Sequence, residues 1–235
     1  MDSDRILIVN ADDFGHSAPV NAGVIRAHEE GIVTSTSLMV RRPAVEEAAV
    51  YVRSRPQLAV GLHVELVEWQ FVDGTWVSMG AVEDGRVAAE VEAQLERFVA
   101  LVGREPTHLD SHQHVHRREP ALSAVVEAGR KLRVPVRDID PRIRYFGWFY
   151  GQTDTGEPFP EGITAENLRT IVGSLDDGIT ELGCHPAVGA VPGSSYSTER
   201  EQELATLCDP SVRRALADAG VELRSFANVL KGPSE

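Results

Sequence analysis

The side chains best suited to chemistry lie together in one short stretch of the chain. Residues 108–116 read HLDSHQHVH, so four of the eight histidines and one carboxylate fall within this stretch. Imidazole is the commonest metal ligand among side chains and exchanges protons near neutral pH, whereas neighbouring histidines give a fold no packing advantage. The stretch therefore indicates a metal-binding or acid–base site, and the alternative is a solvated histidine-rich turn.

Strand-like and helix-like segments alternate around this stretch and must position it. Short apolar, β-branched runs predict strands at residues 5–10, 34–40, 58–62, 107–110, 134–136, 178–183 and 221–226. Apolar residues at helical spacing, with glycine or proline at the ends, predict helices at residues 19–30, 43–54, 87–102, 119–132, 165–174 and 198–219, the last interrupted at Pro210.

This alternation predicts one α/β domain over residues 1–235, because no low-complexity linker or internal repeat divides the chain. Right-handed crossovers between successive strands make such a sheet parallel. About seven strand–helix units favour a variant (β/α) barrel, imperfectly closed, over a doubly wound open sheet. The number of strands does not by itself decide whether the barrel closes.

Two segments lack a clear pattern. Residues 64–80 give little regular signal, and we expect the aromatic side chains in this loop, Trp69, Phe71 and Trp76, to pack against the protein rather than contact a ligand. Residues 145–160 are aromatic and rich in glycine and proline, which suggests a loop over one face.

Ionisable side chains follow the predicted strands at their C-terminal ends. They are Asp12 and Asp13 after the first strand, His63 after the third, His112 after the fourth, Arg137 after the fifth and His185 after the sixth. In a parallel barrel these ends share one face. Two histidines and one carboxylate can form a metal site with open coordination positions, and a second carboxylate beside it can act as a base. Adjacent aspartates could also cap a turn, but one would suffice.

Composition limits the partners and the location. The formal net charge of −13 argues against nucleic acid or an anionic membrane as a partner, because both require clustered Lys and Arg. The chain has no long apolar run, no signal-peptide pattern and only two cysteines, so we expect a cytoplasmic protein without a disulfide framework. Strand alternation predicts that Cys184 is buried and faces away from His185. A homo-oligomer is left open.

Five motifs together resemble the YdjC-like carbohydrate deacetylases, which include chitooligosaccharide deacetylases. In chain order they are NADDFG at 10–15, GIVTSTS at 31–37, GLH at 61–63, PTHLDSHQHVH at 106–116 and CHP at 184–186. The resemblance covers nearly the whole chain, although many relatives are longer between residues 64 and 86. It implies a variant (β/α) barrel, one divalent metal ion, Mg or Zn, and hydrolysis of the N-acetyl group of a sugar or oligosaccharide.

The resemblance also implies roles for individual residues. The family's metal ligands match Asp13, His63 and His112. Its base matches Asp12, and a similarity to polysaccharide deacetylases in general gives supporting roles to Arg137 and His185.

The implied reaction uses a water activated by the metal to attack the acetyl carbonyl. Asp12 would take the proton of this water, Arg137 would keep Asp12 ionised, and His185 as an imidazolium would protonate the departing amine. Two alternatives stay open: a metal-dependent phosphoesterase, which needs more carboxylates and cationic phosphate clamps than the sequence offers, and a sugar-binding protein without turnover.

Overall fold

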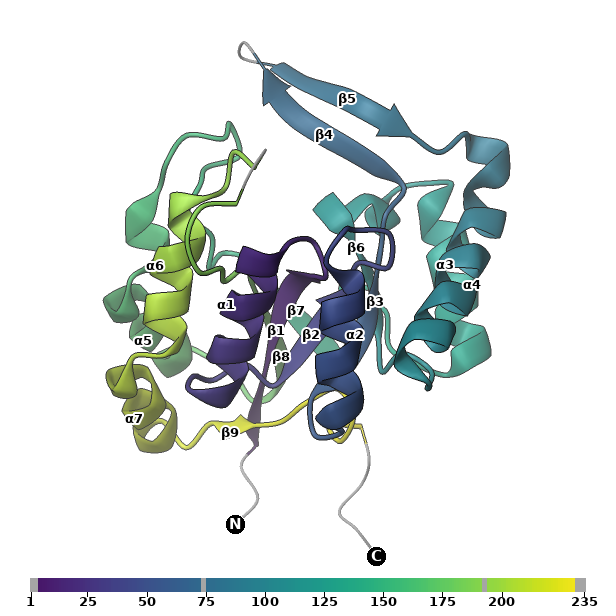
Figure 1. Cartoon of the computed structure of the whole chain (residues 1–235). Coiled ribbons are helices and arrows are strands. Elements are labelled where there is room, and N and C mark those ends of the chain that lie inside the picture. The colour runs from purple at the N-terminus through teal and green to yellow at the C-terminus, as the bar shows by residue number, and fades with distance from the viewer. Residues whose placement is uncertain (1–3, 73–74, 192–193, 231–235) are drawn as a thin grey trace, which may run out of the picture.

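The computed structural model describes residues 4–72, 75–191 and 194–230. Within them a seven-stranded parallel sheet has the order β6-β3-β2-β1-β8-β7, and β9 pairs with β1 beside this path. Its strands are β1 (Arg5–Phe14), β2 (Ser35–Leu38), β3 (Ala59–Val64), β6 (Leu109–Ser111), β7 (Ile143–Phe146), β8 (Gly178–Cys184) and β9 (Glu222–Leu223). The sheet curls into a half-barrel with β6 and β7 at its two edges (Figure 1), so the predicted barrel-like α/β fold is confirmed.

Helices surround the sheet and bury an apolar stripe. They are α1 (Ala18–Glu29), α2 (Val45–Ser54), α3 (Val87–Val102), α4 (Ala121–Leu132), α5 (Ala165–Gly173), α6 (Thr198–Leu207) and α7 (Pro210–Asp218). In α1, for example, Val20, Val24 and Ala27 recur at helical spacing and are fully buried. None of the described helices combines the length and apolar character needed to cross a membrane.

The predicted strand at 134–136 is wrong, although the predicted number of strands is right. Val136 makes only one isolated parallel bridge, with Leu109. Pro135 has no N–H to donate, so a longer ladder is disfavoured at this position. The seventh strand is instead β7, which overlaps the start of the segment that we expected to be a loop.

The predicted strand boundaries also differ from the structure, most of all at the end of the first strand and at the end of the last. The first strand was expected to end at Asn10, but β1 continues to Phe14. The last was expected over 221–226, but only Glu222–Leu223 pairs with β1. The chain then turns at Ser225, whose backbone N–H donates to Asn228.

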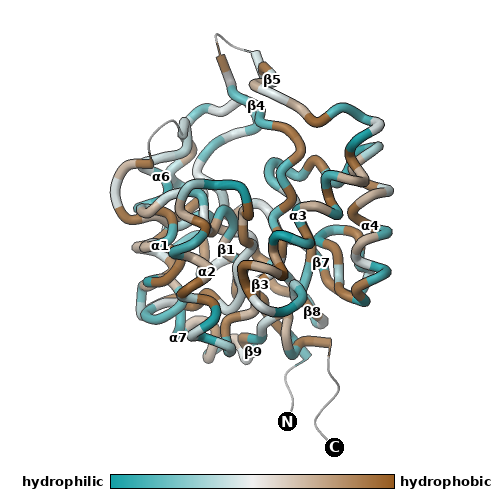
Figure 2. The backbone as a smooth tube through the Cα atoms, turned by 45° about the vertical axis from the view of Figure 1, so that its right-hand side comes forward, coloured by the Kyte–Doolittle hydropathy of each residue, from teal (hydrophilic) through white to brown (hydrophobic). Residues whose placement is uncertain are grey.

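The segment 64–80 forms an antiparallel hairpin of β4 (Val67–Val72) and β5 (Thr75–Ala81), so the expectation of an irregular loop is wrong. The hairpin projects beyond the C-terminal ends of the parallel strands (Figure 1), and Figure 2 shows hydrophobic stretches along it. The expectation that its aromatic residues pack is also wrong for Trp69 and Trp76, which are 40% and 51% exposed. The side chain of Phe71 lies outside the described part.

Small residues on β3 make room inside the half-barrel, but a histidine fills it. A Cβ atom on Gly61 would lie 2.5 Å from Nε2 of His108. His108 is fully buried and stacks on Phe226 with ring centroids 3.8 Å apart. Burial lowers its pKa to about 3, and its two ring nitrogens face the hydroxyls of Ser37 and Thr107, so this histidine is a neutral part of the interior.

Candidate metal centre and active site

A bulge at the end of β1 turns two consecutive carboxylates toward the same cleft. Strand alternation alone would point Asp12 and Asp13 to opposite faces. The register with β2 shifts between Ala11 and Phe14, and Asp13 adopts a left-handed backbone with φ of 65°. Such bulges and left-handed residues re-aim side chains near functional sites. Both aspartates are 2% exposed and line one cleft.

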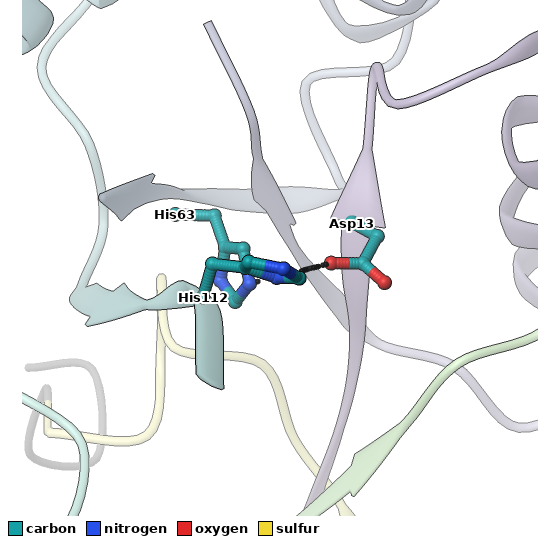
Figure 3. Close-up of side chains that lie close together, drawn as sticks. All are labelled: Asp13, His63 and His112. Atoms are coloured by element: carbon teal, nitrogen blue, oxygen red, sulfur yellow. Dashed lines mark ion pairs between the residues drawn. The ribbon is translucent and has the colours of Figure 1, made fainter. Parts of the chain in front are cut away.

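Asp13, His63 and His112 lie together at the strand ends (Figure 3). Asp13 Oδ1 is 3.4 Å from His63 Nε2 and 3.3 Å from His112 Nδ1, and one donor atom from each residue falls within 4.8 Å of the others. Asp13 Oδ1 is buried and has no hydrogen-bond partner within the described residues. One carboxylate and two imidazoles are a donor set that suits a divalent ion, so the residues present fit a metal.

The outer ring nitrogen of each histidine faces a carboxylate. His63 Nδ1 lies 2.8 Å from Asp110 Oδ1, and His112 Nε2 lies 3.4 Å from Glu68 Oε1. Such outer contacts fix the ring orientation and the tautomer of metal-binding histidines. Burial by itself would lower the pKa of both imidazoles, but Asp110 at His63 and Asp13 at His112 raise it above its ordinary value. The carboxylates around the two histidines therefore stabilise a positive charge in the pocket.

The second oxygen of Asp13 is held by an arginine from α6. Arg200 Nη2 donates to Asp13 Oδ2 at 2.6 Å, and Arg200 is only 5% exposed. Burial alone would raise the pKa of the Asp13 carboxyl, but the Arg200 charge and the neighbouring histidines hold it well below its usual value. Asp13 is therefore ionised and presents its other oxygen to the two histidines.

Arg137 binds both carboxylate oxygens of Asp12. Its Nη1 and Nη2 donate to the two Asp12 oxygens at 2.6 and 2.7 Å, and it also contacts Asp110 at 2.9 Å and Glu181 at 2.7 Å. Asn10 donates to Asp12 Oδ1 at 2.8 Å. Burial would raise the pKa of Asp12, but the guanidinium reverses the effect and keeps the carboxyl ionised.

His185 follows β8 and approaches Asp12 from the other side. Its Nε2 is 3.8 Å from Asp12 Oδ2, and its backbone N–H donates to Glu203. The imidazole meets the rings of Tyr150 and Tyr196 edge to face, at 5.4 and 5.8 Å between centroids. Burial lowers its pKa to about 4. His185 is therefore neutral at pH 7 in the free protein.

One cleft of about 840 Å³ is lined by Asp12, Asp13, His63, His112, His185 and Arg200. It is lined by residues at the C-terminal ends of the strands, by residues of the hairpin and by residues of the segment 147–159. His114 lines it, and its Nδ1 has no hydrogen-bond partner among the residues that the structure describes, while its Nε2 lies 3.4 Å from the hydroxyl of Tyr145. Burial lowers the pKa of His114 to about 2, so it offers a neutral ring to a ligand.

The comparisons with known proteins agree with this geometry. The model of the family described as YdjC-like protein matches residues 6–218. The chain belongs to the YdjC-like family. A carbohydrate deacetylase of Geobacillus stearothermophilus is 35% identical over 97% of this chain and 99% of its own length. A chitooligosaccharide deacetylase of Klebsiella pneumoniae is 35% identical over 96% of this chain and the whole of its own.

A solved structure shares this YdjC-like fold closely. It is a protein of Enterococcus faecalis described as a proposed cellobiose-phosphate cleavage protein, with a TM-score of 0.78 and 27% identity, and the match covers 96% of this chain and 98% of that one.

The histidines of residues 108–116 in this YdjC-like chain have different roles. His112 joins the metal cluster and His114 lines the cleft. His116 is buried between Ser111 Oγ at 2.6 Å and the Arg137 carbonyl at 3.0 Å, so it fastens the 3-10 turn η2 (His112–Arg117) to the sheet. Cys184 is fully buried in the core, as predicted.

The sequence interpretation missed four supporting residues of the site: Glu68, Asp110, Arg200 and Glu203. Asp110 carried a usable signal, because period-two alternation puts it on the same face as His108 and His112. Arg200 and Glu203 carried none, because they reach the site from a helix that is remote in sequence from the strand ends.

Proposed function

We propose that this chain is a metal-dependent carbohydrate deacetylase that removes the acetyl group from the nitrogen of an N-acetylated sugar. The observation that carries the proposal is a carboxylate–imidazole cluster beside a second carboxylate clamped by an arginine. It lies in a chain that matches named carbohydrate deacetylases over nearly its whole length.

Asp13, His63 and His112 would hold one divalent ion. When bound, the ion would polarise the acetyl carbonyl and make water nucleophilic near neutral pH. Imidazole donors favour Zn by affinity, whereas Mg is favoured by abundance. The carboxylates Asp110 and Glu68 support this by keeping the two imidazoles oriented through their outer nitrogens.

Asp12 is the base in this proposal. Its carboxyl is ionised at neutral pH because Arg137 lowers its pKa, and it lies in the same cleft as the cluster. A carboxyl with a lowered pKa takes the proton of the attacking water only briefly. The neutral imidazole of His185, 3.8 Å away, is the next acceptor, and from there the proton reaches the departing amine. The relay needs no imidazolium in the free protein.

The direct test is acetate release from N-acetylglucosamine and its oligomers by protein stripped of metal and reloaded with Zn or Mg. We expect release with at least one metal. Asp12→Asn keeps the shape of the side chain and should retain metal while turnover falls about 10²- to 10⁴-fold, the usual scale for loss of a general base. Absence of acetate with every metal would refute the function, and loss of metal in Asp12→Asn would reverse the roles of the two aspartates.

The phosphoesterase alternative finds less support in the described residues. It favours a second metal about 4 Å from the first. A second cluster exists, of Asp12, His63 and Asp110, but Arg137 already pairs with both of its carboxylates at 2.6 and 2.9 Å. A guanidinium in that place opposes a second cation. The acetate assay also tests the remaining alternative, a sugar-binding protein without turnover, because such a protein would release no acetate.

A further inference from the structure

The interior of the half-barrel holds a carboxyl group that the proposed mechanism does not use. Glu181 on β8 is fully buried and is not among the described residues that line the cleft, so a substrate in the cleft does not reach it. In the register of the sheet it pairs with Ile8 of β1 and Tyr145 of β7. Burying a carboxylate is costly unless a positive charge pairs with it, and a carboxyl without such a partner keeps its proton.

Glu181 contacts the same arginine that binds the proposed base. Arg137 Nε and Nη2 both lie 2.7 Å from Glu181 Oε1, while Nη1 and Nη2 donate to the two oxygens of Asp12. Glu181 therefore holds the Nε side of the guanidinium, and Asp12 holds its outer end. The guanidinium is planar and rigid, so the two carboxyl groups compete for one delocalised charge.

Three buried carboxyl groups share this one positive charge. Asp110 is the third, because its Oδ2 lies 2.9 Å from Arg137 Nη2, and it also contacts His63. Burial alone would raise the pKa of Asp12 and Asp110, but Arg137 lowers both below the ordinary value. Glu181 differs from them, because its Oε2 has no hydrogen-bond partner within the described residues. Of the three groups, Glu181 therefore binds a proton most readily.

The surroundings of Glu181 decide its charge. Burial raises its pKa to about 7, an effect that Arg137 opposes and that the carboxylates Asp110 and Asp12 increase. Tyr145 faces it from the neighbouring strand, and burial raises the pKa of this hydroxyl well above its ordinary value, so Tyr145 stays neutral. Glu181 therefore gains or loses a proton around pH 7, while the groups that face it keep their charge states.

We propose that Glu181 is a positioning residue for the base: it shares Arg137 with Asp12, and its charge sets how readily Asp12 takes the proton of the attacking water. When Glu181 is neutral, the charge of Arg137 is directed at Asp12, which then accepts a proton poorly. When Glu181 is ionised, it competes for the guanidinium, and Asp12 becomes the better base. This inference rests on the proposed deacetylase function.

The test compares kcat and KM for acetate release by metal-loaded wild type and Glu181→Gln between about pH 5 and pH 9, on the N-acetylglucosamine oligomer that the wild type hydrolyses fastest. Glutamine keeps the shape and the acceptor oxygen of the side chain but stays neutral. We expect equal kcat values at the acidic end and about tenfold faster turnover by the wild type at the basic end, with KM unchanged. The change should fall at pH 7 or somewhat below, because a bound cation favours ionisation of Glu181.

A neighbouring residue on β8 provides the matched control. Thr180 is 2% exposed, and its hydroxyl has no hydrogen-bond partner in the part of the chain that the structure describes. The ratio of wild-type kcat to that of Thr180→Val should be the same at every pH. A second measurement needs no substrate: the infrared difference spectrum between metal-free wild type and Glu181→Gln should show a protonated carboxyl at about pH 5 that disappears by about pH 9.

The outcomes separate this role from the function on which it rests. A ratio of wild-type to Glu181→Gln kcat that does not change with pH would overturn the proposal and leave the deacetylase function intact. An infrared band that stays unchanged over the whole range would do the same, because Glu181 would then have one charge state. Absence of acetate from every sugar with the wild type would instead refute the function, and this role of Glu181 with it.

Discussion

The pKa values of histidine and carboxyl side chains shift in opposite directions on the two walls of the cleft. On the wall built by the ends of β1, β3 and β6, the pKa of His63 is raised and that of Asp13 is lowered, although burial alone would do the reverse. On the wall built by β8 and α6, burial dominates, so the pKa of His185 falls to about 4 and that of Glu203 rises to about 8. His63 and Asp13 on the first wall are therefore charged, whereas His185 and Glu203 on the second are neutral, and the charge of Arg200 on α6 is directed at Asp13.

The difference has a simple physical origin. The carboxylates of the first wall meet guanidinium groups, Arg137 at Asp12 and Arg200 at Asp13, so ionisation is favoured despite burial. The carboxyl oxygens of Glu203 accept hydrogen bonds from two neutral donors, the backbone N–H of His185 and the hydroxyl of Tyr196. The ionised carboxylates of the first wall favour binding of a cation, whereas the neutral imidazole of the second wall can accept a proton and donate it again. The charge state of each group is therefore set by its surroundings rather than by its residue type.

The largest expected effect comes from removing a donor on the charged wall. We expect His112→Ala to lose metal and nearly all activity, because one of three donors disappears. Metal content by elemental analysis after dialysis is the measurement, and affinity should fall by more than the about 10- to 100-fold that loss of an outer contact costs. His114→Ala, two residues away, is the matched control and should keep its metal. If the two variants behaved alike, the cluster would need a different third donor.

A smaller effect is expected on the neutral wall. His185→Ala should slow hydrolysis of an N-acetyl sugar by about 10²-fold or more, the usual scale for a general acid, while metal content stays unchanged. An activated ester such as nitrophenyl acetate needs no protonated leaving group and should be affected far less. Rates on both substrates, measured with the same metal-loaded preparations, check this. Equal losses on both would mean that His185 positions the acetyl group, and would move the proton donor elsewhere.

Features of the site that depend on residues close together in the sequence could be predicted, whereas features that depend on distant residues could not. The positions of His63 and His185 at strand ends follow from local apolar runs, and those runs set most of the parallel sheet. The hairpin was also readable in principle: residues 67–71 alternate apolar and polar side chains, and Asp73-Gly74 is a strong hairpin signal. Its aromatic residues mask this signal, because aromatic side chains outside regular structure usually pack against the protein.

Other features could not be read from a local pattern. The bulge that turns Asp12 and Asp13 to one side is a tertiary adjustment against β2, and strand periodicity predicts the opposite. The proton state of His185 depends on how deeply two tyrosine rings bury it, which no spacing in the chain reveals. The partner of Asp13, Arg200, is 187 positions away in sequence.

The smallest expected effect tests whether the second wall is neutral. In the folded protein the pKa of Glu203 is raised from 4.5 to about 8, mainly by burial. The folded state therefore keeps a proton that the unfolded chain releases above about pH 4.5. The stability due to this proton is fully present below that pH and is lost as pH rises through about 8. Glutamine cannot lose the proton, so Glu203→Gln removes this dependence.

We therefore expect the Tm of the metal-free wild type to fall relative to that of Glu203→Gln by a few degrees between about pH 5 and pH 9. Calorimetric scans of both proteins across this range measure it. Glu201→Gln, which changes an exposed carboxylate on the same helix, should follow the wild type at every pH. Parallel curves for wild type and Glu203→Gln would mean that Glu203 is already ionised when folded. Glu203 on the β8–α6 wall would then be charged, as Asp13 is on the opposite wall. The neutral state of His185, on which the proposed proton transfer depends, would then need another explanation.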